Sequence, residues 1–156
     1  MYINSTCFFE GTNISEGRGT TKPFEMIGAP WLSAYGLADF MNDKNLEGVL
    51  FRPVYFTPSF SKHQGDLCRG TQLHVTDRKS YSPVKTGLHL LEAVKKLSGK
   101  EFNYTKAYTD AGKPMIDYNT GNDFIRTHDF DPETVYQEWS RESEEFFNRK
   151  KKYQLY

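Results

Sequence analysis

Residues 82–99 read SPVKTGLHLLEAVKKLSG and carry the clearest periodic pattern in the chain. Apolar side chains recur there about every 3.6 residues, the period that places them on one face of an α-helix. Pro83 is tolerated in a first helical turn, and Gly99 is a common stop signal. We therefore predict an amphipathic helix over residues 82–97 whose apolar face packs on a hydrophobic core. Its apolar stripe consists of Val84, Leu88, Leu91 and Val94.

Strands are predicted on the amino-terminal side of this helix. Residues 48–60 are rich in apolar and aromatic side chains, although Pro53 places that strand at a sheet edge or a bulge. Residues 71–76 alternate, which puts Leu73 and Val75 on one face of a strand. The polar side chains of the same segment line up on the opposite face; they are Gln72, His74 and Thr76.

The remaining segments add further short strands and helices. Residues 3–9 are rich in β-branched and aromatic residues and predict a strand that leads into a loop. No repeat or linker interrupts the chain, so we expect a single α+β domain with a mostly antiparallel sheet and helices packed on one face. The other expected elements are a short strand over 24–27 and helices over 31–42, 115–120, 123–127 and 131–150.

The composition indicates a globular protein and narrows its partners. The chain has 156 residues, which suits one domain, and its 20 Lys and Arg balance 20 Asp and Glu. A formal charge of zero gives no general attraction to polyanions, so nucleic-acid binding is not expected. The apolar runs are far shorter than the roughly 20 residues of a membrane span. Residues 1–4 do not resemble the start of an export signal, so we expect no signal peptide on this chain.

The glycine-rich segment 10–21, EGTNISEGRGTT, gathers groups that bind polar ligands. It contains two carboxylates, the guanidinium of Arg18 and several hydroxyls, between glycines that permit close backbone approach. Such a backbone can hold an anion, and a guanidinium forks onto a carboxylate through paired hydrogen bonds. Two interpretations stay open here: a ligand-binding loop, or a surface turn whose polar groups bond to one another.

The histidines and cysteines do not predict a metal site. None of the four histidines is spaced from another histidine or a cysteine as zinc ligands are, so we expect no metal and no cofactor. His63 falls in a polar turn and His74 on the polar face of a predicted strand; each is either a site residue or a residue of local structure. Cys7 and Cys68 allow one disulfide, but two small buried thiols are the favoured interpretation.

Six short strings, in this order along the chain, resemble those of the exo-β-N-acetylmuramidase (NamZ-type) family. The resemblance is dense up to Asp77 and thinner after Leu97. The strings are CFFEGTN at 7–13, EGRGT at 16–20, FEMIGAPW at 24–31, FRP at 51–53, TPSFSKH at 57–63 and QLHVTDR at 72–78.

The resemblance implies a bacterial enzyme that removes N-acetylmuramic acid from the non-reducing end of peptidoglycan fragments. Its site would lie between a larger, Rossmann-like amino-terminal domain and a smaller carboxyl-terminal domain, to which residues 1–156 correspond. Residues 1–23 would be the substrate-site strand and the loop that follows it. The amino-terminal domain, with its Pro-Glu-His-Gly type segment and general acid, is not among these residues. We therefore expect one wall of a sugar-binding cleft rather than a complete catalyst, and a periplasmic or secreted location.

The resemblance also implies roles for the residues of the loop. Arg18 would pair with the lactyl carboxylate of N-acetylmuramate. Glu10 would be the catalytic carboxylate that orients a sugar hydroxyl or a water, since glycoside hydrolysis normally needs two carboxyl groups. The alternative is a non-catalytic carbohydrate or cell-wall binding domain, or a purely structural one. The other expected substrate contacts are Asn13, Ser15 and Thr20, with His63 and His74 as second-rank candidates.

Overall fold

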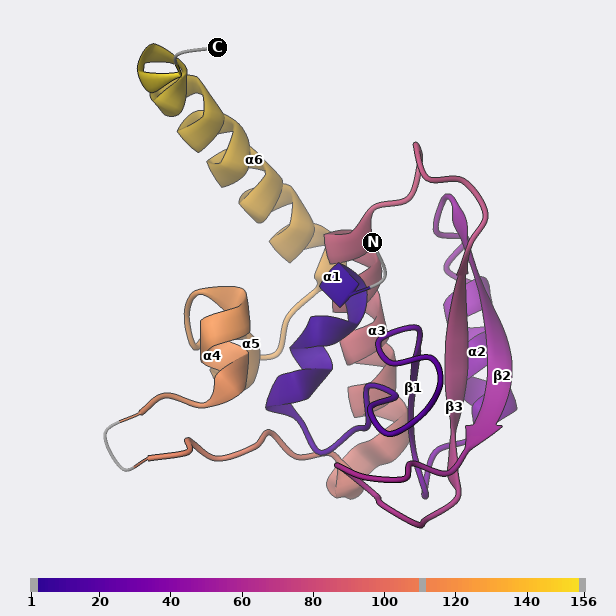
Figure 1. Ribbon diagram of the computed structural model, residues 1–156. Coiled ribbons are helices and arrows are strands. Elements are labelled where there is room, and N and C mark those ends of the chain that lie inside the picture. Colours follow the sequence, from indigo (N-terminus) through magenta and orange to yellow (C-terminus); the bar gives the residue numbers. More distant parts are fainter. Residues whose placement is uncertain (1–2, 110–111, 155–156) are drawn as a thin grey trace.

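A three-stranded antiparallel sheet forms one side of the molecule (Figure 1). The computed structural model describes residues 3–109 and 112–154. The central strand, β3 (Cys68–Val75), pairs on one side with β1 (Met26–Ala29) and on the other with β2 (Val49–Phe56). The edge position of β2 accounts for Pro53, which cannot donate a hydrogen bond to a neighbouring strand.

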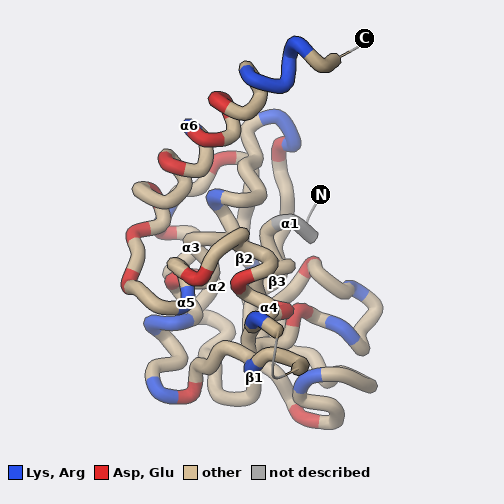
Figure 2. The backbone as a smooth tube through the Cα atoms, turned by 90° about the vertical axis from the view of Figure 1, so that its left-hand side faces the viewer, with Lys and Arg blue, Asp and Glu red and all other residues tan. Residues whose placement is uncertain are grey.

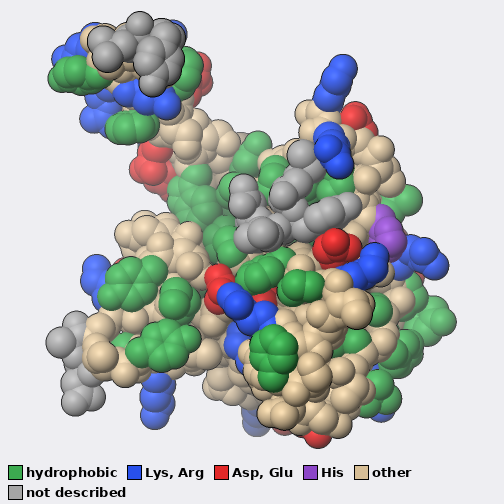
Figure 3. All heavy atoms as spheres, in the orientation of Figure 1, with side chains coloured by type: hydrophobic (Ala, Val, Ile, Leu, Met, Phe, Trp, Pro, Cys, Tyr) green, Lys and Arg blue, Asp and Glu red, His purple; other side chains and the backbone are tan. Residues whose placement is uncertain are grey.

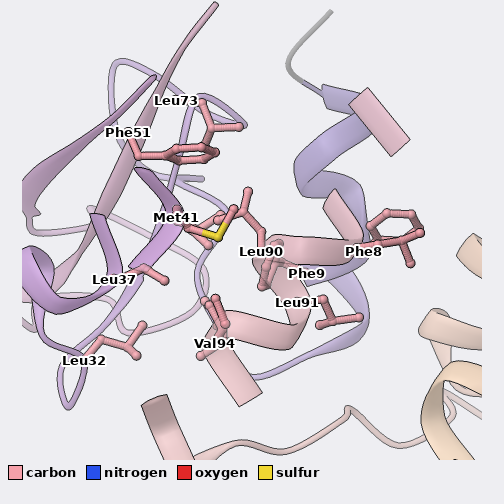
Figure 4. Close-up of a cluster of buried hydrophobic side chains, with 14 of the residues drawn as sticks. Phe8, Phe9, Leu32, Leu37, Met41, Phe51, Leu73, Leu90, Leu91 and Val94 are labelled. Atoms are coloured by element: carbon pink, nitrogen blue, oxygen red, sulfur yellow. The ribbon is translucent and has the colours of Figure 1, made fainter. Parts of the chain in front are cut away.

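Helices cover one face of this sheet. Helix α2 (Ala34–Asn42) lies on β2 and β3, and helix α3 (Pro83–Ser98) packs against α2. Figure 4 shows side chains of both helices converging on a shared core, with the sheet residues Phe51 and Leu73 above them. Because Phe51 and Leu73 are register partners, their side chains lie on the same face, as the alternating pattern predicts. The predicted α+β fold with helices on one face is confirmed.

The helix predicted from residues 82–97 is confirmed as α3. Leu88, Leu91 and Val94 of its apolar stripe are buried and Val84 is partly buried, and Gly99 follows its last residue with a φ of 52°. The short helices α4 (Met115–Thr120) and α5 (Phe124–Thr127) also lie where the sequence predicts them.

The strand predicted over residues 3–9 is wrong. This segment forms a short helix, α1 (Ile3–Thr6), and a 3₁₀ turn, η1 (Cys7–Gly11). Both Phe8 and its neighbour Phe9 are buried, whereas a strand would point successive side chains to opposite faces. Gly87 of α3 makes room for this packing, since a Cβ atom there would lie 2.6 Å from the Phe8 ring. Tertiary packing thus overrides the β-propensity of the segment.

The last helix, α6 (Pro132–Lys150), starts where the sequence predicts and then projects from the body (Figure 1). Asp131 caps it by accepting a hydrogen bond from the backbone N–H of Thr134 at 2.8 Å. Val135 and Trp139 pack on the core, whereas Phe146 and Phe147 are exposed. The backbone colouring in Figure 2 places acidic residues along the middle of α6 and basic residues at its far end. In the part of the chain that the structure describes, no helix has both the length and the apolar character of a membrane span.

Candidate functional site at the glycine-rich loop

The glycine-rich loop is fixed to the sheet and to a second loop. Ser15 pairs with Gly28 of β1 through two backbone hydrogen bonds of 2.9 and 3.0 Å. Gly19 has a φ of 81°, and a Cβ atom on it would lie 2.5 Å from the backbone oxygen of Phe60. The carbonyl of Gly19 accepts the backbone N–H of Ser59 at 2.9 Å. Glycine is needed here because the two loops touch backbone to backbone.

Four charged side chains from these two loops and η1 form one connected cluster, which we call the charged cluster: Glu10, Glu16, Arg18 and Lys62. Arg18 donates to Glu10 through Nη2 and forms an ion pair with Glu16, in which Arg18 Nε lies 2.8 Å from Glu16 Oε1. Lys62 Nζ lies 2.8 Å from the other oxygen of Glu16. The two positive charges balance the two negative ones. Figure 3 shows acidic and basic side chains gathered in the middle of this face, over η1 and the loop.

The charged cluster has a buried half and an exposed half. The side chain of Glu16 is 2% exposed and that of Lys62 23%, whereas those of Glu10 and Arg18 are 30% and 43% exposed. Burial lowers the pKa of Lys62, and the nearby carboxylate of Glu16 opposes that shift. The hydrogen bond from Arg18 to Glu10 raises the pKa of the guanidinium. The buried pair therefore supports the pair that faces solvent.

Lys62 also ties the loop to η1. Its ammonium donates to the backbone carbonyl oxygens of Phe9 at 2.7 Å and Ile14 at 3.1 Å. Neither Lys62 nor Glu16 was predicted as a site residue, because 46 residues separate them in the chain. The signal that could have found them is their presence in two of the family-like strings, EGRGT at 16–20 and TPSFSKH at 57–63.

Three predicted substrate contacts instead build the loop. Asn13 donates from its side chain to the carbonyl of Glu101 at 2.7 Å and accepts from the backbone of Asn103 at 2.9 Å. Ser15 is 1% exposed, and its hydroxyl accepts the backbone N–H of Gly17. Thr20 donates to the carbonyl of Gly17 at 2.7 Å.

The two candidate histidines lie in different places. His63 Nε2 lies 2.7 Å from the carbonyl oxygen of Asn13, and its ring meets the Trp31 ring edge-on with centroids 5.2 Å apart. It therefore borders the charged cluster. His74 lies on the sheet face away from α2, where burial and then the neighbouring Arg52 lower its pKa.

Apart from the charged cluster, the described residues form neither a cluster of metal ligands nor a disulfide, and they line a separate hollow. Within residues 3–109 and 112–154, no group of three or more His, Cys, Asp or Glu is placed to hold a metal ion. In the same residues, Cys7 and Cys68 are not joined by a disulfide. A hollow of about 600 Å³ lies between α3 and the start of α6, and none of the predicted site residues lines it.

The sequence model of the family described as "Exo-beta-N-acetylmuramidase NamZ, C-terminal" matches residues 1–156. The chain belongs to this NamZ family. It is 42% identical over 155 residues to the protein "Peptidoglycan beta-N-acetylmuramidase NamZ" of Bacillus subtilis (strain 168), a match that covers 97% of the chain and 36% of that protein. The predicted family resemblance, including its restriction to the carboxyl-terminal portion, is confirmed.

Two crystal structures of DUF1343 family proteins from Bacteroides fragilis NCTC 9343 resemble the NamZ-family chain. One superposes with a TM-score of 0.82 at 27% identity, and the other with a TM-score of 0.66 at 25% identity. Each match covers 99% of this chain, but only 41% and 40% of the respective solved chains. The chain thus spans well under half the length of the NamZ relative and of both solved chains.

Proposed function

We propose that this chain is the substrate-contacting domain of a peptidoglycan glycosidase that releases N-acetylmuramic acid from the non-reducing end of wall fragments. It would supply one wall of the cleft, and an amino-terminal domain would supply the other wall and the general acid. Membership of the NamZ family and the 42% identity to a protein named as a peptidoglycan β-N-acetylmuramidase support this proposal. A peptidoglycan substrate also favours a periplasmic or secreted location.

The observation that carries the proposal is the ion pair of Glu10 and Arg18 at the surface of the glycine-rich loop. Glu16 contacts Arg18 and forms a second ion pair with Lys62, so a more buried ion pair supports the exposed one. A site that keeps its charged groups in place before the ligand arrives avoids the cost of ordering them on binding.

Arg18 suits an acidic sugar. A guanidinium has five N–H donors, and the contacts with Glu10 and Glu16 use two of its three nitrogens. The remaining N–H groups can donate hydrogen bonds to the lactyl carboxylate, the group that distinguishes N-acetylmuramic acid from N-acetylglucosamine. The centroid of the Phe24 ring lies 4.8 Å from the guanidinium carbon of Arg18, so the ring covers one face of the guanidinium.

Glu10 suits the second carboxylate of a glycosidase. As the partner of a guanidinium it acts as a hydrogen-bond acceptor, so we assign it the orientation of a sugar hydroxyl or an attacking water. Proton donation to the leaving group falls to a residue outside this chain. His63, next to the charged cluster, is a further candidate contact, and Asn13, Ser15 and Thr20 shape the loop around it.

The test uses the protein that joins this domain to its amino-terminal portion and a chromogenic N-acetylmuraminide. Arg18→Gln is expected to lower kcat/KM at least about tenfold, which corresponds to about 1.4 kcal/mol. The control is Glu25→Gln, which removes the acidic partner of a 3.4 Å ion pair with Lys22 just beyond the glycine-rich segment.

Two results decide the proposal. If Arg18→Gln and Glu10→Gln both keep the kcat/KM of the Glu25→Gln control, the charged cluster is not part of the substrate site. If the joined protein binds insoluble peptidoglycan but releases no sugar, the alternative of a non-catalytic wall-binding domain takes its place.

A further inference from the structure

One end of the sheet carries a row of side chains that no helix covers. Ala29, Arg69 and Tyr55 are register partners across β1, β3 and β2, so their side chains lie on the same face. That face carries the core farther along the strands. At this end Tyr55 and Arg69 are exposed, because α2 begins only at Ala34.

Tyr55 and Arg69 line a hollow with a volume of about 420 Å³, whereas Ala29 is buried in the core. The volume of this hollow falls within the range of about 300 to 1,000 Å³ that ligand pockets occupy. Tyr55 is 53% exposed, as is Leu67 beside it. The connection between β1 and α2 supplies the opposite side. The side chains that the argument uses are Trp31, Tyr55, Leu67 and Arg69.

The chemistry of the hollow matches a substituted sugar ring. Aromatic rings such as those of Trp31 and Tyr55 cover the apolar C–H face of a pyranose, and exposed apolar side chains grouped in one place usually mark a binding surface. The guanidinium of Arg69 adds donors for hydroxyl, acetamido or carboxylate oxygens at the rim.

The hollow also continues the surface of the charged cluster. Trp31 contacts the ring of His63, and His63 lies against the backbone of Asn13 in the glycine-rich loop. Lys62 of the charged cluster is the chain neighbour of His63. Trp31 is thus linked to the charged cluster through His63.

We propose that this hollow is a second sugar subsite, which holds the residue adjacent to the terminal N-acetylmuramic acid in the same peptidoglycan fragment. The inference rests on the proposed function, because it assigns the terminal sugar to the charged cluster. The domain then binds at least two linked sugars. Trp31 and Tyr55 stack on the second sugar, and Arg69 makes the polar contact with it.

The fluorescence of Trp31 provides the test. The chain has two tryptophans, so a Trp139→Phe variant leaves Trp31 as the only indole. This variant is titrated with N-acetylmuramic acid and with the disaccharide in which N-acetylmuramic acid is linked to N-acetylglucosamine. The disaccharide is expected to shift the Trp31 emission saturably and to bind at least about tenfold more tightly than the monosaccharide.

A second substitution locates the effect. Tyr55→Ala is expected to remove the advantage of the disaccharide while leaving the affinity for the monosaccharide unchanged. Tyr35→Ala is the matched control, since Tyr35 is a 62% exposed tyrosine of α2 that does not line the hollow. Far-ultraviolet circular dichroism checks that each variant is folded.

The outcomes separate this inference from the proposed function. If the Trp139→Phe protein binds the two sugars equally, both with Tyr55 and with Tyr55→Ala, the second subsite is overturned. A loss of monosaccharide binding in Arg18→Gln would still uphold the proposed function. If Tyr55→Ala weakens the disaccharide and Arg18→Gln affects neither sugar, the hollow binds sugar but the assignment of the charged cluster is wrong.

Discussion

Glu16 and Lys62 are the residues on which the loop depends most. Glu16 is buried and Lys62 is mostly buried, and each compensates the charge of the other. A buried ion pair adds little stability by itself, but a buried charge that loses its partner is costly. The four carbonyl and carboxylate contacts of Lys62 make that loss larger, because they join η1, the loop and Glu16 through one ammonium.

Lys62→Met is expected to lower the free energy of unfolding by about 2 kcal/mol, because buried Glu16 keeps Arg18 but loses its second counter-charge, and two backbone carbonyls lose their donor. Urea denaturation followed by circular dichroism measures the change. Lys22→Met removes the basic partner of an exposed pair and should cost less than about 1 kcal/mol. Equal effects of the two substitutions would show that the contact of Lys62 with Glu16 stabilises the fold no more than an exposed ion pair does.

Cys68 predicts how stability depends on alkaline pH. Burial raises the pKa of its thiol from the ordinary 9.0 to about 11. Between these values the unfolded chain loses the thiol proton and the folded chain keeps it, so ionisation favours unfolding. The free energy of unfolding should therefore be level below pH 9 and fall as the pH rises towards 11. Urea midpoints at several pH values should show a shallower fall in Cys68→Ala; an identical fall in both proteins would rule out Cys68 as its source.

At the scale of single elements, close backbone contact positions the site. The glycine-rich loop has little regular structure, yet its glycines let it lie directly on the loop that carries Lys62 and His63. Helix α6 is the opposite case: its first two turns pack on the core through Val135 and Trp139, and its far half makes little contact with the body.

Gly19→Ala is expected to destabilise the fold by at least about 2 kcal/mol, because it combines a positive φ with a backbone collision against Phe60. Gly121 has almost the same φ, 82°, but open space around its missing Cβ. Gly121→Ala should therefore cost only about 1 kcal/mol. Thermal denaturation of the two variants makes the comparison, and a Gly19 variant no worse than the Gly121 variant would mean that the loop contact is not tight.

Aromatic substitutions along α6 should have unequal effects. Trp139→Ala removes a ring that lies 6.4 Å from that of Phe8 and should cost about 2 kcal/mol. Phe147→Ala removes a 46% exposed ring and should change the free energy of unfolding by less than about 0.5 kcal/mol. Chemical denaturation gives both values. A large effect of Phe147→Ala would indicate that the far half of α6 is packed in solution.

For the whole molecule, the proposed function makes the charged cluster only one side of a site. The chain covers 36% of the Bacillus subtilis relative, and the Glu10 and Arg18 side chains face solvent. Surface charges act weakly in water, so hydrolysis of a glycosidic bond at this place requires a second wall that excludes water and brings an acid.

A chimera tests this view of the molecule. Replacing the matching 36% of the Bacillus subtilis relative with this chain is expected to give a protein that releases N-acetylmuramic acid from a chromogenic muraminide. The 156-residue chain alone is expected to release none. The same chimera with Glu10→Gln is the control for the site. Turnover by the isolated chain would show that the acid lies within it.

The sequence by itself determined the elements whose side chains repeat with a regular period. Helix α3, the strands β2 and β3 and the start of α6 follow from local spacing and capping residues, and these signals act within a few residues of one another. It also determined the family, because six strings keep their order, and it pointed to Glu10 and Arg18 as a pair in one short loop.

Only the tertiary structure decided what depends on residues far apart in the chain. Phe8 packs on α3 from a helical turn, where Gly87 leaves room for its ring. Glu16 meets Lys62 only because two loops touch at a glycine, and no local pattern records that contact. Long-range burial, which carries no period along the sequence, therefore fixed both the amino-terminal turns and the support beneath the candidate site.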